Sequence, residues 1–361
     1  MSRRVFTSAV LLLLFVVMCC GIGGAAHGDK TASGQRSSPK PYFDWRDKNE
    51  VGETVSSLHV PSLVEVNDNV FAVAEAQCTT KDASGLTGIA SELLTWTDGK
   101  TKDLDLSKLK IQAPDECHLK DGQCTYKKTE GADSQSNTKV YVSRPTTVVH
   151  GNAIYMLAGN YSSEGTAAAV KPTDAVQWGL LLVRGNVSEE NVGKRICWRD
   201  TYGLPWGLFS KQESLTRIIG SGGSGVKLKD GPFVFPVEGT KKENNKTVSL
   251  IIYSSATESW KLSKGMSADG CSDPSVVEWN DGKLMMMTAC DDGRRRVYES
   301  GDKGESWTEA LGTLSRVWGK KKDGEAKNVG SGFITATIDG DGTENRNVML
   351  VLCPVYSTEN G

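Results

Sequence analysis

The chain has 361 residues, with 42 lysines and arginines, 44 aspartates and glutamates, and a formal net charge of −2. Because the basic residues are dispersed among nearly equal numbers of acidic ones, no charged region attracts a polyanion, and we expect no nucleic-acid partner. The 39 glycines and apolar runs such as 248–253 and 283–288 favour short strands joined by tight turns. The predicted fold class is therefore all-β.

The N-terminus has the features of a secretory signal peptide. Arg3 and Arg4 precede an apolar run from Ala9 to Cys20, and small residues suited to cleavage follow this run. The run is shorter than the roughly 20 residues that a membrane-spanning helix needs. We predict a signal peptide over 1–26, a flexible segment over 27–50, and passage through the secretory pathway to the cell surface or the extracellular space.

Residues 298–307 contain the pattern Ser-x-Asp-x-Gly-x-Ser-Trp, which is known as an Asp box. The pattern begins at Ser300 and predicts a β-hairpin. Asp302 is expected to accept hydrogen bonds from its own turn, Gly304 to supply a positive φ, and Trp307 to pack under the turn. The motif identifies a structural unit rather than a chemistry.

Two weaker copies of this hairpin occur in the chain. Segment 254–260 keeps the serines and the tryptophan, and segment 95–102 keeps the Asp-Gly turn. Trp260 and Trp307 lie 47 residues apart (307 minus 260), which matches the roughly 40 to 50 residues of a four-stranded propeller blade. The repetition predicts a β-propeller.

Nine cysteines are present, and seven remain once Cys19 and Cys20 leave with the signal peptide. In an oxidising compartment most of them should pair, and an odd number leaves one thiol free or without its partner. Cys117 and Cys124 flank a turn-rich segment and are the best local disulfide candidates. No second Cys or His pair completes a four-ligand zinc site beside them, so we predict no metal.

Three glycosylation sequons lie near turn signals, as expected on the surface of a secreted protein. They begin at Asn160, Asn186 and Asn245. We predict an N-linked glycan on each of them.

Three further segments are highly characteristic: 266–274, 294–300 and 312–319. Together with the hairpin motifs they resemble the sialidase superfamily, and specifically the trypanosome trans-sialidase surface glycoproteins, over residues 53–357. The resemblance implies a six-bladed sialidase-type β-propeller over 51–361. Because the chain ends at Gly361, we expect this propeller to lack its last blade. No cofactor is implied.

The resemblance also implies a site for sialic acid, whose carboxylate lies beside the anomeric carbon. In the family, three arginines hold this carboxylate and a tyrosine is the nucleophile. A glutamate activates the tyrosine, and an aspartate is the acid and base on the glycosidic oxygen.

Three positions of the implied site are altered in this chain, the third of them a substrate-contacting aspartate. His59, in Leu-His-Val-Pro, stands where the family has its first arginine, and it lacks the five-donor guanidinium fork. Glu75, in Ala-Glu-Ala-Gln, stands where active members have the acid/base aspartate, and it is one methylene longer. Arg144, in Ser-Arg-Pro-Thr, stands where they have a substrate-contacting aspartate, so its charge is reversed.

Two other positions are kept. Glu278 matches the glutamate base, and one residue of the 294–296 triplet, best matched by Arg294, is the second arginine. The third arginine and the tyrosine are expected beyond Gly361, as is any membrane anchor.

The leading prediction is therefore a noncatalytic surface or secreted glycoprotein that binds sialylated glycans or host surface or matrix proteins, in adhesion or immune evasion. An exo-α-sialidase or trans-sialidase that uses Glu75, Glu278 and Arg294 is the alternative. A third reading is an antigen without a specific ligand.

Overall fold

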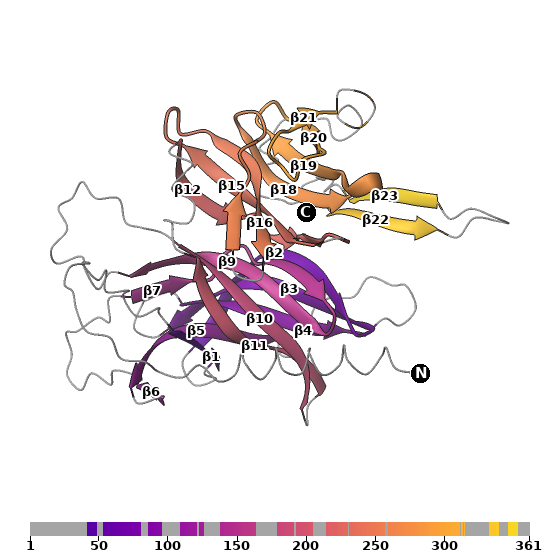
Figure 1. Ribbon diagram of the computed structural model, residues 1–361. Coiled ribbons are helices and arrows are strands. Elements are labelled where there is room, and N and C mark those ends of the chain that lie inside the picture. The colour runs from indigo at the N-terminus through magenta and orange to yellow at the C-terminus, as the bar shows by residue number, and fades with distance from the viewer. Residues whose placement is uncertain are drawn as a thin grey trace, which may run out of the picture. The chain divides into compact units, whose positions relative to one another are not determined.

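A computed structural model describes residues 42–48, 53–80, 86–95, 109–120, 123–125, 138–163, 179–190, 193–204, 214–229, 231–256, 259–310, 312, 314, 332–338 and 346–352 (Figure 1). These residues form strands and turns, with one 3-10 turn at Asn280–Gly282 as their only helical element. None of their helical structure is long and apolar enough to cross a membrane. The predicted all-β class is confirmed.

The chain divides into two units, Met1–Lys40 and Pro41–Gly361. The first unit lies outside the described residues, and the predicted signal peptide lies within it. All the strands belong to the second unit.

Sheet 1 is formed by the N-terminal strands of the second unit. Its order is β1 (Tyr42–Asp47), β5 (Lys110–Lys120), β4 (Leu86–Leu94), β3 (Asn69–Thr80) and β2 (Glu53–Val66), with β6 (Gln123–Thr125) paired to β5. Strand β1 lies inside the segment that was predicted to be flexible. Phe43 and Trp45 alternate into the core, which explains why this stretch pairs with β5. The sheet therefore begins before the predicted boundary at residue 51.

Sheets 2 and 3 follow. Sheet 2 has the order β11 (Gly193–Leu204), β10 (Gly179–Glu190), β9 (Ala153–Ser163), β8 (Thr146–His150) and β13 (Gly223–Ser224), with β7 (Thr138–Tyr141) paired to β9. Sheet 3 has the order β12 (Leu215–Gly220), β15 (Phe233–Lys241), β16 (Thr247–Ala256) and β17 (Ser259–Leu262), with β14 (Val226–Lys227) paired to β15. The strand predicted at 248–253 lies within β16.

Sheets 4 and 5 complete the described strands. Sheet 4 has the order β18 (Cys271–Glu278), β19 (Leu284–Cys290), β20 (Arg295–Ser300) and β21 (Thr308–Glu309). Sheet 5 consists of β22 (Gly332–Ile338) and β23 (Arg346–Leu352). The strand predicted at 283–288 forms most of β19.

Consecutive sheets pack on one another through buried apolar clusters. Burying one such side chain stabilises the fold by about 1.5–3 kcal/mol. Representative pairs are Ile89 and Met156 between sheets 1 and 2, Leu157 and Phe235 between sheets 2 and 3, Ile251 and Met286 between sheets 3 and 4, and Met287 and Phe333 between sheets 4 and 5. Sheets 1 to 4 form four blades of a propeller-like arrangement, and a count of six blades stays a prediction.

The β20–β21 turn is held by hydrogen bonds from its own residues. Ser300 Oγ donates to Asp302 Oδ1 (2.8 Å) and accepts from the Gly304 amide (2.8 Å). Asp302 accepts from the amide (2.9 Å) and the hydroxyl (2.6 Å) of Ser306. These bonds to its charged form lower the pKa of Asp302 to about 2.

Two further residues of this turn are Gly304 and Trp307. Gly304 has φ +85°, and a Cβ there would lie 2.8 Å from Ile251 Cδ1, so a side chain would clash. Trp307 is half-buried and packs against the core between sheets 3 and 4. The weaker motif at 254–260 spans the β16–β17 hairpin, whereas the turn of the motif at 95–102 lies outside the described residues.

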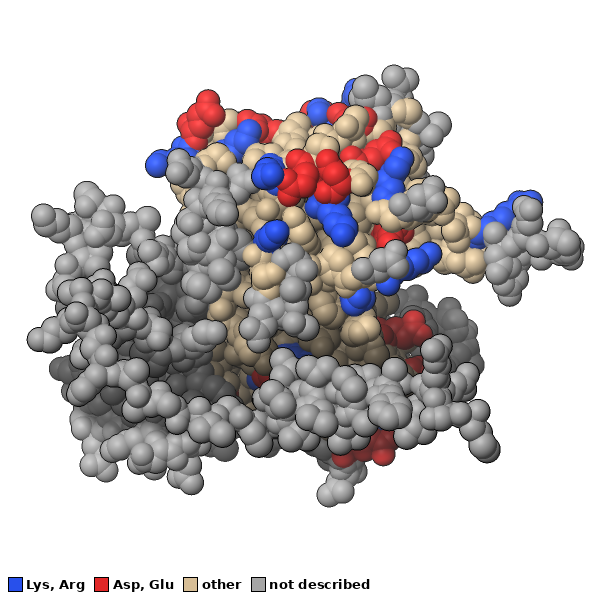
Figure 2. Space-filling view, viewed as in Figure 1, with Lys and Arg blue, Asp and Glu red and all other residues tan. Residues whose placement is uncertain are grey.

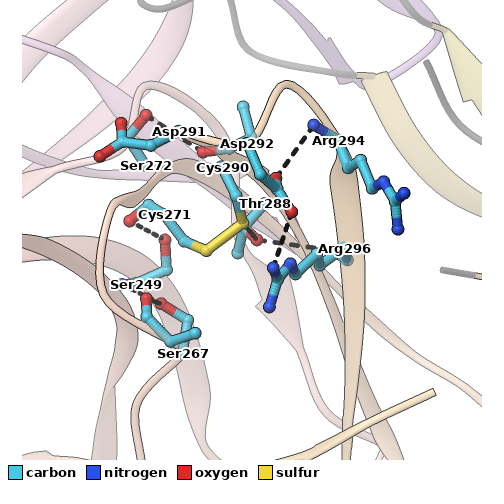
Figure 3. Close-up of a disulfide and its surroundings, with 12 residues drawn as sticks. Ser249, Ser267, Cys271, Ser272, Thr288, Cys290, Asp291, Asp292, Arg294 and Arg296 are labelled. Atoms are coloured by element: carbon cyan, nitrogen blue, oxygen red, sulfur yellow. Dashed lines mark hydrogen bonds and ion pairs between the residues drawn. A yellow bond between two sulfur atoms is a disulfide. The ribbon is translucent and has the colours of Figure 1, made fainter. Parts of the chain in front are cut away.

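One disulfide, between Cys271 and Cys290, joins opposite residues of β18 and β19 (Figure 3). The sequence reasoning did not select this pair. Cys117 lies in β5 and Cys124 in β6, two paired strands, but the side chains of both cysteines lie outside the described part. Cys78 and Cys197 are buried, and Cys197 Sγ lies 3.0 Å from Ser188 Oγ.

We predict that Asp302→Asn lowers the free energy of unfolding by about 1 kcal/mol at neutral pH, because hydrogen bonds to a charged but exposed acceptor are weakened. Since the folded pKa is below the ordinary 3.8, this stability is complete above pH 3.8 and is lost as the pH falls towards about 2. Urea unfolding at several pH values measures the effect. Equal stability of the two proteins at neutral pH would contradict the prediction.

The two faces of sheet 5 differ, and this difference can be tested. Phe333 is buried against sheet 4, whereas Ile334 and Leu350, opposite one another on the other face, are 51% and 47% exposed. Phe333→Ala should cost about 3–5 kcal/mol of unfolding free energy. The double change Ile334→Thr/Leu350→Thr should alter it by only about 0.5 kcal/mol while reducing apolar-dye binding. A comparable loss of stability in both variants would show that the second face is covered in solution.

Candidate functional site

Four sheets meet at Arg144, which lies between β7 and β8 of sheet 2. Its backbone amide donates to Glu75 Oε2 in β3 of sheet 1 (2.9 Å). Its Nη2 donates to Glu238 Oε1 in β15 of sheet 3 (2.6 Å) and to Asp273 Oδ1 in β18 of sheet 4 (2.7 Å). We call Glu75, Arg144, Glu238 and Asp273 the Arg144 cluster.

The backbone turns inward at two members of this cluster. Arg144 has φ +51° and precedes Pro145, a position where the right-handed helical conformation is disfavoured. Asp273 has φ +49° and lies at a bulge in the β18–β19 register. Positive φ at a residue with a side chain costs about 1–3 kcal/mol and persists where the surrounding contacts impose it. Here the ion pair between the two side chains supplies such a contact.

Glu238 and Asp273 are also joined by a hydrogen bond, which the backbone amide of Asp273 donates to Glu238 Oε1 (2.9 Å). Both residues are buried, as is Glu75. Burial raises the pKa of Glu238, the positive charge of Arg144 opposes this rise, and the negative charge of Asp273 adds to it. With all groups ionised, the Arg144 cluster contains three carboxylates and one guanidinium and carries a net negative charge; Glu238 and Asp273 contact the guanidinium, and Glu75 contacts the backbone amide.

The guanidinium of Arg144 is already engaged within the protein. Its Nη2 has two hydrogens but three acceptors, since the Ser221 carbonyl also lies within hydrogen-bond distance (2.9 Å). Its Nε is buried without a hydrogen-bond partner among the described residues. The fork that would bind a carboxylate through two parallel bonds is therefore not presented to a ligand.

His59 lies beside the Arg144 cluster. It is opposite Glu75 in the β2–β3 register, so the two side chains share a face of sheet 1. His59 is exposed, and its Nε2 is 2.8 Å from Ser57 Oγ. Of the five predicted site residues, the structure thus brings together Glu75, Arg144 and His59.

The described hydrogen bonds of Glu278 and Arg294 are with groups outside the Arg144 cluster. Glu278 ends β18, five residues beyond Asp273, on the order of 16 Å at ~3.3 Å per residue. One of its oxygens accepts from the Lys229 amide (3.1 Å). Arg294 is exposed in the turn before β20, where its amide donates to Asp292 Oδ1 (3.1 Å; Figure 3). The catalytic and binding roles of Glu278 and Arg294 stay predictions.

Sequence reasoning missed Glu238 and Asp273. A signal existed for each: Glu238 is the one charged residue in the buried stretch Val234–Gly239 of β15, and Asp273 lies within segment 266–274, which carried the family resemblance. A buried carboxylate in a strand requires a partner, and Arg144 is that partner here. In the described ranges no three His, Cys, Asp or Glu side chains are grouped as metal ligands.

Comparison with known proteins agrees with the sequence motifs. Residues 60–361 match the family model of the BNR repeat-like domain. The chain is 31% identical to Sialidase 85-1.1 of Trypanosoma cruzi, over 97% of this chain and 49% of the relative. A second sialidase of Trypanosoma cruzi is 36% identical over 54% of this chain and 17% of the relative. The chain thus spans half or less of the length of these two relatives.

Solved structures give the same relationship. A mutant of Trypanosoma rangeli sialidase displaying trans-sialidase activity has a TM-score of 0.56 and 27% identity, over 82% of this chain and 44% of the mutant. Trypanosoma rangeli sialidase in complex with the inhibitor DANA has a TM-score of 0.56 and 26% identity, over 87% and 49%. The chain belongs to the BNR repeat-like domain family and, within it, to the trypanosome sialidase and trans-sialidase superfamily.

Proposed function

We propose that this protein is a noncatalytic member of the superfamily that binds host glycans or host proteins, in adhesion or immune evasion. The observation that carries the proposal is the engagement of Arg144 by Glu238 and Asp273. Holding the carboxylate of sialic acid needs guanidinium donors that are free to bind it. The Nη2 group of Arg144 donates to carboxylates of the protein itself.

The charge balance of the Arg144 cluster supports the same proposal. The carboxylate of a sialic acid would add a fourth negative charge beside Glu75, Glu238 and Asp273. Placing like charges together in a partly desolvated site costs several kcal/mol. We therefore expect the partner to be recognised through groups other than a sialic acid carboxylate bound at this cluster.

We also propose that the protein passes through the secretory pathway to the cell surface or the extracellular space. The Cys271–Cys290 disulfide supports this route, because disulfides persist in oxidising compartments. Asn245 is exposed in the turn between β15 and β16, where a glycan would meet no strand. Asn186 is half-buried within β10, and the side chain of Asn160 lies outside the described part.

The charges of the described surface suit a protein or glycan partner better than a polyanion. On the face that Figure 2 shows, Lys and Arg lie among Asp and Glu, and neither sign forms a continuous patch. Several charges of the described residues are paired, for example Lys264 with Glu305 and Lys283 with Glu299. Such mixed surfaces give little long-range attraction.

The alternative function is an exo-α-sialidase or a trans-sialidase. It is favoured by the sialidase relatives and by the position of Glu75, a buried carboxyl group within the Arg144 cluster. In this alternative Glu75 is the general acid, a role that contributes about 10²–10⁴-fold to a rate. The two functions therefore differ in the effect of removing Glu75.

We predict that the purified chain hydrolyses a fluorogenic sialoside no faster than its Glu75→Ala variant, because the Arg144 cluster repels the carboxylate of the substrate. Release of the fluorophore measures the rate, with Trypanosoma rangeli sialidase as the positive control. A rate in the chain roughly 10-fold or more above the Glu75→Ala variant would support the enzyme instead.

A second prediction concerns the stability of the cluster. Arg144→Ala should lower the unfolding free energy by about 3–5 kcal/mol, because it leaves Glu238 and Asp273 buried without their cation. Arg184→Ala is the matched control, since Arg184 forms an exposed ion pair with Asp200 and should cost less than about 1 kcal/mol. Urea unfolding compares the two. A similar small cost for both variants would show that Arg144 is not needed to balance the carboxylates.

A further inference from the structure

The disulfide between Cys271 and Cys290 (Figure 3) lies two residues from Asp273 along β18. Between Ser272 and Ser275 the β18–β19 register shifts, because β18 advances by three residues there and β19 by two. Asp273 lies in this bulge, has φ +49°, and is 3% exposed. A bulge leaves its extra residue unpaired in the ladder, so the residue pairs on either side of the bulge hold it in place.

The two sides of this bulge are held unequally. On one side the ladder continues over four residues of β18, Ser275–Glu278, and the two valines among them are buried in the cores on the two faces of sheet 4. On the other side, at the start of β18, the ladder has two pairs, Ser272 with Ala289 and Cys271 with Cys290. We call these two pairs the short side. The disulfide is one of them.

Hydrogen bonds also hold the short side. The Asp291 amide donates to the Gly270 carbonyl (2.9 Å), and Ser249 Oγ donates to the Cys271 carbonyl (3.1 Å; Figure 3). A strand end held by a few hydrogen bonds opens locally far more often than a strand in the core. The covalent bond opposes this opening, because it keeps the two strands adjacent even when the hydrogen bonds break.

Opening of the short side would take Asp273 out of the Arg144 cluster. Asp273 Oδ1 accepts from Arg144 Nη2 (2.7 Å), and the Asp273 amide donates to Glu238 Oε1 (2.9 Å). Both bonds need the bulge in its present place, because a shift of one residue along a strand turns a side chain to the opposite face. The disulfide and the ion pair are therefore connected through two residues of backbone.

We propose that the Cys271–Cys290 disulfide is a redox-sensitive switch that holds Asp273 in the Arg144 cluster, and that a dithiol is its reductant. Cys290 is half-buried and Cys271 is fully buried, so a thiolate of the dithiol attacks Cys290 Sγ, and Cys271 leaves as a thiolate and takes up a proton. The second thiol of the dithiol then attacks the mixed disulfide and releases Cys290, which takes up the other proton. Two cysteines are reduced, and the dithiol is oxidised to its own disulfide.

The switch has a closed and an open state. In an oxidising compartment the bond persists and Asp273 stays paired with Arg144. In a reducing one the short side opens and this pair is weakened. The switch stands or falls independently of the proposed function, because its effect is a local opening of the fold and not binding or hydrolysis.

Hydrogen exchange of the full chain, measured by mass spectrometry, tests the switch. The chain is compared without and with millimolar dithiothreitol, which is a dithiol, and alkylation with iodoacetamide shows whether Cys271 and Cys290 are reduced. We expect reduction of the folded chain and exchange that is roughly 10-fold or more faster over 271–275, because this end of β18 then opens more often. The buried stretch 154–158 of β9 in sheet 2 should keep its rate.

Two variants connect the effect to this disulfide. Cys271→Ala/Cys290→Ala removes the bond and no other, so its exchange over 271–275 should be as fast as in the reduced chain and should not respond to dithiothreitol. Cys197→Ala is the matched control, since Cys197 is buried in sheet 2 outside this disulfide. It should keep both the slow exchange and the response to dithiothreitol.

Three results would overturn the proposal. The first is that dithiothreitol does not reduce the bond in the folded chain. The second is that neither reduction nor the double variant speeds exchange over 271–275, which would mean that other contacts hold the short side. The third is that exchange over 154–158 rises as much as over 271–275, or that the reduced chain unfolds, which would mean that the bond stabilises the whole fold.

Discussion

The ion pairs of Arg144 with Glu238 and Asp273 are the interaction on which the centre of this propeller-like structure depends. They connect sheets 2, 3 and 4, and the Arg144 amide adds sheet 1 through Glu75. Each charge lies where water has little access, so each needs the others. The positive φ of Arg144 and of Asp273 is explained by the same contacts, because both backbones turn their side chains towards one point.

This interaction also connects the fold to the proposed function. A guanidinium that neutralises carboxylates of the protein contributes to cohesion between sheets, and its engaged donors are not available to a carboxylate sugar. The chain has the all-β, propeller-like arrangement of the sialidase superfamily, and the family resemblance implies that active members carry the opposite charge at this position. A scaffold can be retained in this way after its chemistry changes.

Local patterns in the sequence were sufficient to predict much of the fold. The turn at Ser300 to Trp307 and the strands β16 and β19 follow from residues close together in the chain. Glu75 and Arg144 could be selected because their segments match family motifs. Glu238 and Asp273 lie 94 and 129 residues from Arg144, and no local pattern encodes a contact over that separation. Cys271 and Cys290 were missed because their pairing depends on the register of two strands.

The most direct measurement is a double-mutant cycle between Arg144 and Asp273, with Arg144→Met, Asp273→Asn and the double variant compared by urea unfolding. If the buried ion pair holds the sheets together, the two single changes are strongly coupled. The double variant then loses less unfolding free energy than the sum of the two single losses, by roughly 1.5 kcal/mol or more. Effects that add to within about 0.5 kcal/mol would contradict the account, because they would show that the two side chains do not interact in solution.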